Sequence, residues 1–311
     1  MTDLILHHYP TSPYAEKIRA ILGYKKLPWK SVHIPTVMPK PDLLPLTGGY
    51  RKTPVLQIGA DIYCDTKLIA RVIEQRQPEP TLIPASLSAS IAMQEAWSEE
   101  LFLLMVPIVM QPAGLALFFS QLPPDAPAIF QKDRQALFAG GGGTRPSMKR
   151  TQSELPAALA RLDIQLANSK FLHGEQPTLA DFSLFHPVWF VRNNPGIANS
   201  FDAYRHLLAW YGRIAAYGHG QPGKMTGTEA LEIARSSTPQ ASDDGDLPDP
   251  GGLKTGDAVV VSATDYGADP VKGVLVRSSL DAVSICREGD RVGEVVVHFP
   301  RAGFRMTADK G

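Results

Sequence analysis

The chain has 311 residues, 44% of them hydrophobic, and its 31 Lys and Arg residues are balanced by 31 Asp and Glu residues. This length and apolar content predict two or three domains with buried cores, and they argue against a chain that is disordered throughout. A neutral chain lacks the basic surface that binds nucleic acid through its phosphates, so no nucleic-acid partner is expected.

Cysteine and histidine usage and the N-terminus bear on compartment and metal binding. Cys64 and Cys286 are the two cysteines, and they lie too far apart for a disulfide framework or a zinc site. The eight histidines show no ligand spacing beyond the adjacent His7 and His8, so no metal is expected. Residues 1–7 carry an acid where a secretion signal has basic residues. We therefore expect a cytoplasmic protein.

Strand and helix patterns alternate over residues 1–80. The helix that follows the first strand is predicted to begin at Pro13, with Ser12 as its N-cap, and to stop at Gly23. The expected elements are a strand at 4–6, a helix at 13–22, a strand at 29–34, a loop with at most a short helix at 35–49, a hairpin at 55–63 and a helix at 65–77. This order predicts a thioredoxin-like α/β domain.

An uncharged stretch, residues 101–119, approaches the length of a membrane span. Pro107, Gln111 and Pro112 lie inside it, Glu99 and Glu100 precede it, and no basic cluster flanks it. We interpret it as a buried helix that its prolines kink or interrupt, and we expect no membrane partner.

Helical patterns without strand signals fill residues 85–235. Leucines recur at helical spacing at 155, 159, 162 and 166, and a second apolar stripe runs from 204 to 214. Thr178 and Asp181 form a capping box at the start of another apolar helix. The run Gly140–Gly143 lacks the lysine of a phosphate-binding loop and is interpreted as a flexible connection. These residues predict an all-helical domain.

The last quarter of the chain changes composition twice. Residues 236–252 are acidic and rich in Ser, Pro and Gly, which is typical of a linker. Short β-rich segments follow at 257–263, 271–277, 282–287 and 292–299, with 305–306 as a candidate fifth. Their number and spacing suggest a small SH3-like β-barrel over residues 253–311.

Four motifs occur together over residues 1–235: Ser12-Pro13-Tyr14-Ala15-Glu16, Thr53-Pro54, Asp65-Thr66 and Thr178-x-x-Asp181. In this order and spacing they resemble the glutathione transferase family. The resemblance implies glutathione as substrate, a homodimer, and Ser12 in the position of the family's active-site serine or cysteine. It also implies a cis bond before Pro54. The C-terminal β segment departs from the family's common two-domain pattern.

Ser12 is the predicted catalytic residue, because glutathione attacks as a thiolate whereas a free thiol has a pKa of about 8.5. The exposed N–H groups and positive end of a helix that begins at Ser12, together with its hydroxyl, can stabilise the anion. A purely capping role for Ser12 is the alternative. Tyr9, where other members of the family place a catalytic tyrosine, and Thr11 are rivals for the role. With Ser12 and Ala15 in place of two cysteines, dithiol chemistry is disfavoured.

The resemblance assigns the remaining glutathione contacts to the same domain. Thr53, before Pro54, would offer its backbone to the cysteinyl part, and Asp65 with Thr66 would hold the γ-glutamyl end. Asp65 and Thr66 equally suit a helix N-cap, and both roles are compatible. Lys40 is a candidate for the glycyl carboxylate, with Lys52 as a second.

The resemblance places the electrophile pocket between the two domains, against the first helices of the helical domain. Its candidate walls are Tyr14, Phe102, Met105 and Met110, each of which suits a plain core position equally well. The chain is therefore expected to be a glutathione transferase-like enzyme with a small-molecule electrophile as partner. The alternative is a non-catalytic binding or scaffold protein of the same fold, whose C-terminal β domain recruits a partner. For the β domain itself, a role in packing on the transferase body or in completing a dimer is an equal alternative to recognition.

Overall fold

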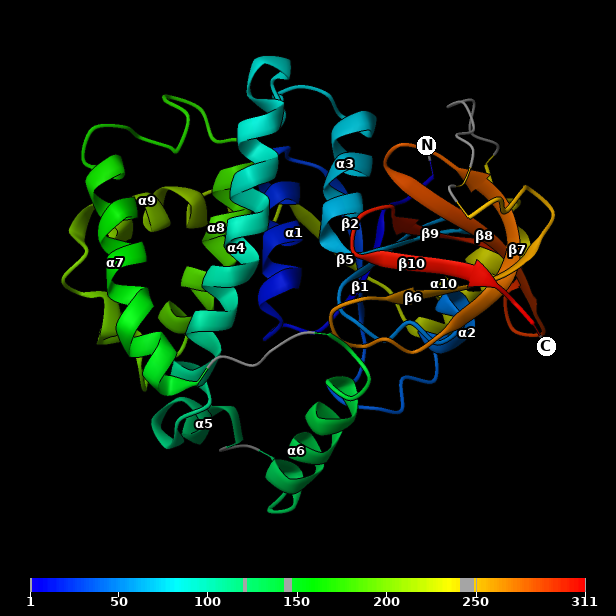
Figure 1. The fold of residues 1–311 in the computed structure, drawn as a ribbon, viewed down its shortest axis with the longest axis horizontal. Helices are drawn as coiled ribbons and strands as arrows, with labels where there is room; N and C mark the ends of the chain where they lie inside the picture. Colours follow the sequence, from blue (N-terminus) through cyan, green and yellow to red (C-terminus); the bar gives the residue numbers. More distant parts are fainter. Residues whose placement is uncertain (1, 120–121, 143–146, 241–248, 250, 311) are drawn as a thin grey trace.

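The computed structural model describes residues 2–119, 122–142, 147–240, 249 and 251–310. The N-terminal part is a thioredoxin-like domain, as the sequence predicts. Its elements are β1 (Ile5–His8), α1 (Pro13–Tyr24), β2 (Pro28–His33), α2 (Leu44–Thr47), β3 (Val55–Ile58), β4 (Asp61–Cys64) and α3 (Thr66–Arg76). The strands lie in the order β4-β3-β1-β2, with β2 parallel and β3 antiparallel to β1. Helices α1 and α3 cover one face of this sheet and α2 the other (Figure 1).

Helix α1 begins where the sequence places it but does not end there. Pro13 is its first residue, and the Ser12 hydroxyl accepts a hydrogen bond from the Ala15 N–H at 3.2 Å. The prediction that Gly23 stops the helix is wrong, since the helix includes Gly23 and ends at Tyr24. A Cβ at Gly23 would lie 2.1 Å from the carbonyl oxygen of Gly218. Glycine is therefore needed here because another segment crosses the helix closely.

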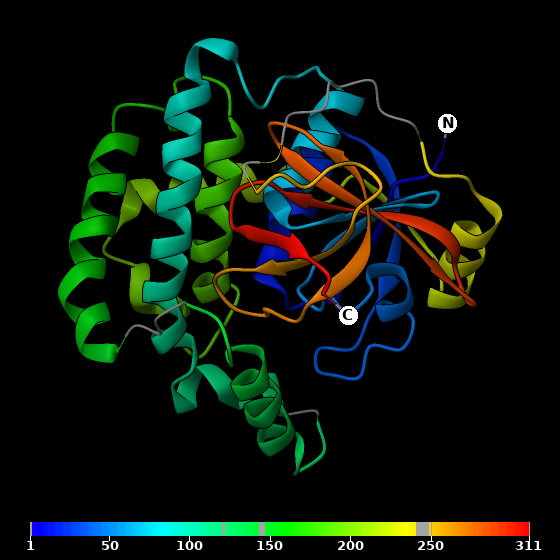
Figure 2. The ribbon, with the colours of Figure 1, turned by 45° about the vertical axis from the view of Figure 1, so that its right-hand side comes forward.

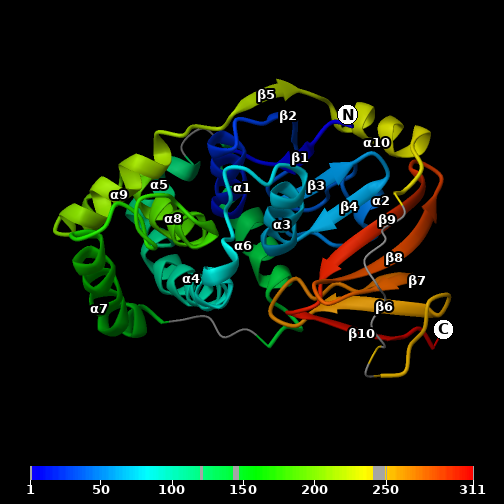
Figure 3. The ribbon, with the colours of Figure 1, turned by 90° about the horizontal axis from the view of Figure 1, so that it is seen from above.

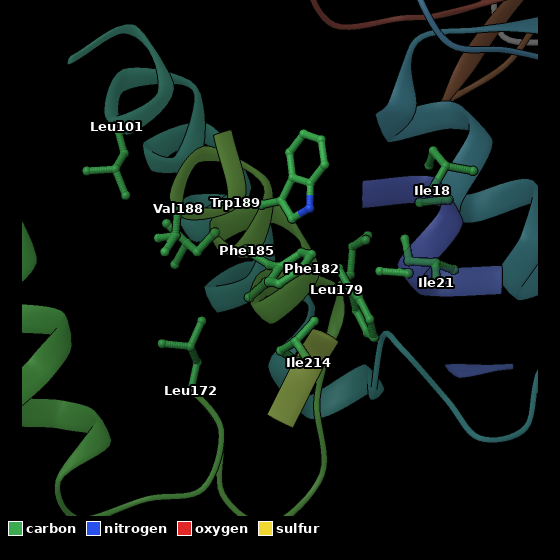
Figure 4. Packing of buried hydrophobic residues seen from close by; sticks show 14 of the residues in the cluster. Ile18, Ile21, Leu101, Leu172, Leu179, Phe182, Phe185, Val188, Trp189 and Ile214 are labelled. Carbon is green, nitrogen blue, oxygen red and sulfur yellow. The ribbon is translucent and has the colours of Figure 1, made fainter. Parts of the chain in front are cut away.

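The helical domain follows, and its long helices confirm the expected apolar stripes. Its elements are the short 3₁₀ turns Ala85–Leu87 and Ala198–Phe201 and the helices α4 (Ser88–Val109), α5 (Pro112–Phe119), α6 (Ala126–Leu137), α7 (Met148–Leu166), α8 (Leu179–Arg192) and α9 (Arg205–Ala215). Helix α8 is buried along almost its whole length and packs against α1, α4 and α9. Figure 4 shows Phe182 and Phe185 of α8 among apolar side chains of these three helices. A single core therefore joins the helical domain to α1.

The uncharged stretch is interrupted, as its prolines predict. Helix α4 ends at Val109 and α5 begins at Pro112, so residues 110 and 111 break the run. Proline has no N–H to donate, but the N–H groups of the first helical turn have no partner within the helix. Pro112 is therefore well suited to the start of α5. Within the described parts of the chain, no helix is both long and apolar enough to cross a membrane. Helices α5 and α6 project as a pair beyond the other helices (Figure 2).

The capping box at the start of α8 is confirmed. Asp181 accepts from the Thr178 N–H at 2.8 Å and also from the Leu172 N–H and the Trp210 indole, both at 2.9 Å. Burial raises the pKa of Asp181, and these donors oppose that effect. The box thus stabilises the helix start and ties it to the preceding loop and to α9.

A strand that the sequence pattern does not reveal follows the helical domain. Strand β5 (Gln221–Lys224) pairs in parallel with β2, and helix α10 (Gly227–Ser236) follows it. The sequence Gln-Pro-Gly-Lys has no β-branched or alternating apolar residues, so its strand conformation comes from pairing with β2 rather than from propensity. The expectation of helices alone up to residue 235 is therefore wrong at β5.

The C-terminal strands form at nearly the predicted places but not as a separate tethered barrel. They are β6 (Ala258–Ala263), β7 (Val271–Ser278), β8 (Ala282–Gly289), β9 (Gly293–Pro300) and β10 (Phe304–Ala308). Strand β9 pairs in parallel with β4, which gives one sheet in the order β10-β6-β7-β8-β9-β4-β3-β1-β2-β5. Seen from above, this sheet curves from β5 round to β10 (Figure 3). The expected tethered domain is thus joined to the thioredoxin-like sheet, because β9 covers the open edge of β4, and the SH3-like identity of these five strands stays a prediction.

The extended sheet encloses a second core. The first core lies among α1, α3 and the helical domain, whereas the second joins α2 and α10 to the inner face of the C-terminal strands. At the junction, His298 of β9 hydrogen-bonds to Asp61 of β4 at 2.9 Å and to Ser284 of β8 at 2.8 Å, and it stacks on Tyr63. The C-terminal strands, which we call the β lobe (residues 258–308), are therefore packed on the thioredoxin-like domain.

Two predicted connections lie partly outside the described residues. Gly143 and residues 241–248 and 250 are not described, so the predicted flexibility of 140–143 and the linker at 236–252 are not tested there. The described part of the glycine run is not free of contacts, because the Gly142 N–H donates to the Thr264 carbonyl at 3.1 Å.

Candidate active site

A cavity of about 330 Å³ lies where the thioredoxin-like domain, the helical domain and the β lobe meet. Its polar half is lined by residues 9 and 11–13, by Thr36 and Lys40, and by residues 51–53, whereas Tyr14 of α1 belongs to the other half. Its apolar half comes from α4, α5, α6 and α8, together with Tyr266 of the loop between β6 and β7. The cavity is open to solvent on one side, as a site for small molecules requires.

Ser12 lies at the wall of this cavity as the N-cap of α1. The residue is buried, its N–H donates to the Tyr9 carbonyl at 3.1 Å, and its hydroxyl oxygen accepts from Ala15. Because that bond uses a lone pair, the hydroxyl can still donate its proton, and the Tyr9 phenol, with which Ser12 shares a side-chain hydrogen bond, and a ligand in the cavity are alternative partners. The capping role and a ligand-binding role are thus compatible in one side chain.

Both rivals of Ser12 also line the cavity. Tyr9 is partly buried, and burial raises the pKa of its phenol, so it too carries a proton that it can donate. Thr11 is exposed at the entrance. The geometry brings all three hydroxyl groups to one end of the cavity.

Lys40 and Thr53 lie together in the polar half. The Lys40 ammonium donates to the Arg51 carbonyl at 2.9 Å and to the Thr53 hydroxyl at 3.0 Å. Burial, followed by the nearby charges of Arg134 and Arg51, lowers the pKa of Lys40 to about 7. The Thr53–Pro54 bond is cis, as expected, and Pro54 itself is buried behind the cavity wall. Lys52, the second lysine candidate, also lines the cavity.

Asp65 and Thr66 occupy the start of α3, outside the residues that line the cavity. The Asp65 carboxylate caps the helix by accepting from the Lys67 N–H at 2.9 Å, and Thr66 is buried. Asp65 has a φ of +73°, an uncommon conformation for a residue other than glycine. The structure therefore shows the capping role of this pair and leaves its ligand-binding role as a prediction.

Three of the four expected electrophile contacts line the cavity. Tyr14 and Phe102 stand side by side, with ring centroids 4.8 Å apart, and Met110 is exposed at the end of α4. Met105 is instead fully buried in the core. The helix explains the difference, since Phe102, Val106 and Val109 share one face of α4 and Met105 points away from it.

An ion pair that the sequence does not reveal joins the two halves of the cavity. Asp133 of α6 pairs with Arg51 and accepts from the Met38 N–H at 2.9 Å. Both side chains of the pair are nearly inaccessible to solvent, with 6% and 9% exposure. No local motif links residues so far apart in the chain, so only the fold reveals the pair.

Tyr266 is the second residue that the sequence did not suggest. It belongs to the β lobe yet lines the cavity beside Phe138, on which its ring stacks at 4.8 Å. The Lys52 ammonium lies 4.2 Å from the centre of the same ring. No metal-binding group of three or more His, Cys, Asp or Glu side chains occurs among the described residues.

The fold and the cavity define the class of protein: a thioredoxin-like domain joined to a helical bundle, with a site at the start of the first helix. Models of the glutathione S-transferase N-terminal and C-terminal domains match residues 6–81 and 145–213. The chain belongs to the glutathione S-transferase family.

Individual relatives agree with this assignment. A GST-like protein from Pseudomonas syringae is 40% identical, has a TM-score of 0.83, and covers 99% of this chain and 100% of its own. Glutathione S-transferase 3 of Zea mays is 25% identical over 222 residues, which are 70% of this chain and 90% of the maize protein. A glutathione S-transferase from Methylobacillus flagellatus, solved with glutathione bound, shares the fold at 18% identity and a TM-score of 0.51, over 71% of this chain and 100% of its own. The coverage of the Pseudomonas protein includes the β lobe.

Proposed function

We propose that the protein is a glutathione transferase in which Ser12 activates the glutathione sulfur for attack on an apolar electrophile. The observation that carries the proposal is the position of the Ser12 hydroxyl, which caps α1 through its oxygen at the wall of the cavity and has the Tyr9 phenol as its hydrogen-bonding neighbour. Membership of the glutathione S-transferase family supports glutathione as the thiol substrate.

In the proposed mechanism Ser12 acts as a hydrogen-bond donor and does not itself gain or lose a proton. The serine hydroxyl donates a hydrogen bond to the sulfur, and the N-terminal end of α1 adds a favourable field, so both stabilise the thiolate over the thiol. The thiol proton passes to solvent and the thiolate sulfur forms a bond to the electrophilic carbon. Either the leaving group departs with the electron pair of its bond, or the double bond opens and its far carbon takes up a proton from solvent, and in both cases the product is a thioether. Stabilising the anion is the chemical task of this half of the cavity.

The polar half also has groups suited to the ends of glutathione. Lys40, in its cationic form, is proposed to pair with the glycyl carboxylate, and Thr53 is proposed to offer its backbone to the cysteinyl part, since both line the cavity. Asp65 and Thr66 are proposed for the γ-glutamyl end. The apolar half, with Tyr14, Phe102 and Met110, is proposed to take the electrophile.

Calorimetry with glutathione tests the proposal directly, using the wild type, Ser12→Ala, Tyr9→Phe and Thr11→Val. The wild type should bind glutathione and lower its thiol pKa below the free value of about 8.5, as measured by thiolate absorbance. Ser12→Ala should restore the free pKa and reduce kcat/KM for an activated aryl halide by about 100-fold, the effect of one lost donor to a developing anion.

The two other variants separate Ser12 from its rivals. Tyr9→Phe and Thr11→Val should leave the bound thiol pKa unchanged. A return to the free pKa in Tyr9→Phe but not in Ser12→Ala would transfer the role to Tyr9. Absence of glutathione binding by the wild type would overturn the proposal as a whole.

A homodimer in the cytoplasm is proposed on family membership alone. Light scattering of the purified chain tests the oligomeric state, and a monomeric mass across the micromolar range would contradict it.

A further inference from the structure

We propose that the β lobe completes the electrophile half of the active site, and that Tyr266 is the side chain by which it selects flat aromatic electrophiles. The proposal rests on the function proposed above and deepens it, because it assigns a role to a part of the chain outside the two domains that the family models match.

The loop between β6 and β7, residues 264–270, is bound to both other domains. Its Asp265 carboxylate pairs with Lys52 of the thioredoxin-like domain at 2.6 Å. On the helical side, the Gly267 N–H donates to the Leu137 carbonyl at 2.6 Å and the Thr264 carbonyl accepts from Gly142 at 3.1 Å. Backbone hydrogen bonds have narrower geometry than contacts of long side chains, so these two bonds fix the position of the loop relative to the end of α6.

The contact between this loop and the helical domain is also sterically close. A Cβ at Gly141 would lie 1.8 Å from the Asp265 carbonyl oxygen, so only glycine fits beneath the loop. On the other side, Gly267 has a φ of +57° and lies against Leu137 and Lys52. Two glycines from distant parts of the chain therefore allow the loop to approach α6 and the cavity.

These contacts of the loop place Tyr266 in the wall of the cavity. Its ring lines the cavity, stacks on Phe138 and lies under the Lys52 ammonium. Its hydroxyl interacts with that of Tyr14, which donates to Glu99 at 2.7 Å. Tyr14 is two residues from Ser12, so Tyr266 stands near the place where the proposed reaction occurs.

The chemistry of Tyr266 is that of a neutral, aromatic contact. Burial, followed by the Glu99 carboxylate, raises the pKa of its phenol, so the hydroxyl remains protonated at neutral pH. A second stacked pair, Phe102 and Phe190 with centroids 5.5 Å apart, lies in the same cavity. Aromatic side chains pack best on flat rings in offset or edge arrangements. The occupant that suits these walls is therefore an aromatic rather than a branched aliphatic electrophile.

The test compares two probes on the full-length chain, glutathione and S-benzylglutathione. Both contain the glutathione part, but only the second places a ring in the electrophile half. Calorimetry on Tyr266→Leu should show binding of S-benzylglutathione weakened by about tenfold, the size of one aromatic contact, with glutathione affinity changed less than twofold. Tyr266→Phe, which keeps the ring, should retain most of the wild-type affinity for both.

Asp269→Ala is the matched control, because Asp269 is exposed in the same loop and does not line the cavity. It should leave both affinities unchanged. In kinetic assays, Tyr266→Leu should lower the preference for an aromatic over an aliphatic electrophile of equal intrinsic reactivity. This readout separates a substrate contact from a structural role, since unfolding or loosening of the β lobe would reduce both activities alike.

The outcomes distinguish this inference from the proposed function. Equal weakening of both probes, or no weakening of either, in Tyr266→Leu would overturn the role of Tyr266, while glutathione binding by the wild type would still support the proposed function. Failure of the wild type to bind either probe would overturn the proposed function itself.

Discussion

The two halves of the cavity are built in different ways. The polar half, around Ser12, Lys40 and Thr53, comes from one domain and depends largely on backbone geometry: a helix start, a loop and a cis peptide bond. The apolar half is assembled from three consecutive helices, α4 to α6, together with the distant helix α8 and the loop at Tyr266. It depends on side chains that reach the cavity only because the whole chain folds.

This difference separates what each half can recognise. Backbone N–H groups and buried polar side chains have fixed directions, so the polar half suits a ligand whose hydrogen-bonding groups never vary, the role that we propose for glutathione. Aromatic walls discriminate by shape, and one substitution there alters the shape without disturbing the polar half. Affinity for the constant substrate and preference for the variable one should therefore respond to different mutations.

The largest effect on stability is expected from the ion pair between Arg51 and Asp133, which joins the two halves. Asp133→Ala would leave the buried Arg51 guanidinium without its partner and remove the acceptor of the Met38 N–H. An uncompensated buried charge destabilises a fold by about 3 kcal/mol or more, so the free energy of unfolding should fall by that amount in urea titrations. Because the pair spans both halves, this variant should also weaken glutathione and S-benzylglutathione together.

Gln135→Ala is the control for that variant, since it changes an exposed residue of the same helix. Its free energy of unfolding should stay within about 0.5 kcal/mol of the wild type. If Asp133→Ala were equally mild, the two halves would be held together by other contacts, and the ion pair would not connect them.

Much of the polar half could be predicted from sequence, because its residues belong to short local motifs of one domain. Ser12 followed by Pro13 is a helix start whatever surrounds it, and Thr53-Pro54 and Asp65-Thr66 lie next to elements that the hydrophobic pattern predicts. Even there, the sequence could not say that Asp65 lies outside the residues that line the cavity, because that depends on how the start of α3 sits in the fold.

The apolar half and the β lobe were harder to predict. The strands of the β lobe follow from their apolar alternation, but the pairing of β9 with β4 joins residues more than 200 positions apart and has no local signal. Met105 and Phe102 look equivalent in sequence, and only the rotation of α4 separates a core residue from a cavity wall. Tyr266 carries no motif at all, and its place depends on that pairing and on Gly141.

A pH series examines the polar half alone. With a folded-state pKa of about 7, Lys40 is cationic below pH 7 and becomes neutral above it. Affinity for S-methylglutathione, whose sulfur cannot ionise, should therefore fall by up to about tenfold between pH 6 and 9, equal to the loss of about one ion-pair contact. Lys40→Met should bind more weakly at pH 6 and show a flat profile in calorimetry.

The same group gives a stability prediction of the opposite slope. Its pKa is lower in the folded chain than the ordinary 10.5, so the unfolded chain holds more protons between about pH 7 and 10.5. The cost of burying Lys40 is therefore greatest below pH 7 and declines as the pH rises. The wild type should gain stability relative to Lys40→Met over this range, whereas parallel profiles would contradict the lowered pKa.

The smallest effect is expected where the β lobe meets the polar half through charge. Lys52 and Asp265 lie 2.6 Å apart, but half of the Asp265 side chain is exposed, and such pairs contribute less than about 1 kcal/mol. Asp265→Asn should change the free energy of unfolding by less than that, and the affinity for S-benzylglutathione by less than twofold. Lys272→Gln, which breaks an exposed pair with Asp309 at a distance from the cavity, is the control.

The backbone bonds at Gly267 and Gly142 explain why so little should change, because they hold the loop without any charge. A large, salt-dependent loss of S-benzylglutathione binding in Asp265→Asn alone would show instead that the ion pair positions Tyr266, and the apolar half would then depend on electrostatics as much as the polar half does.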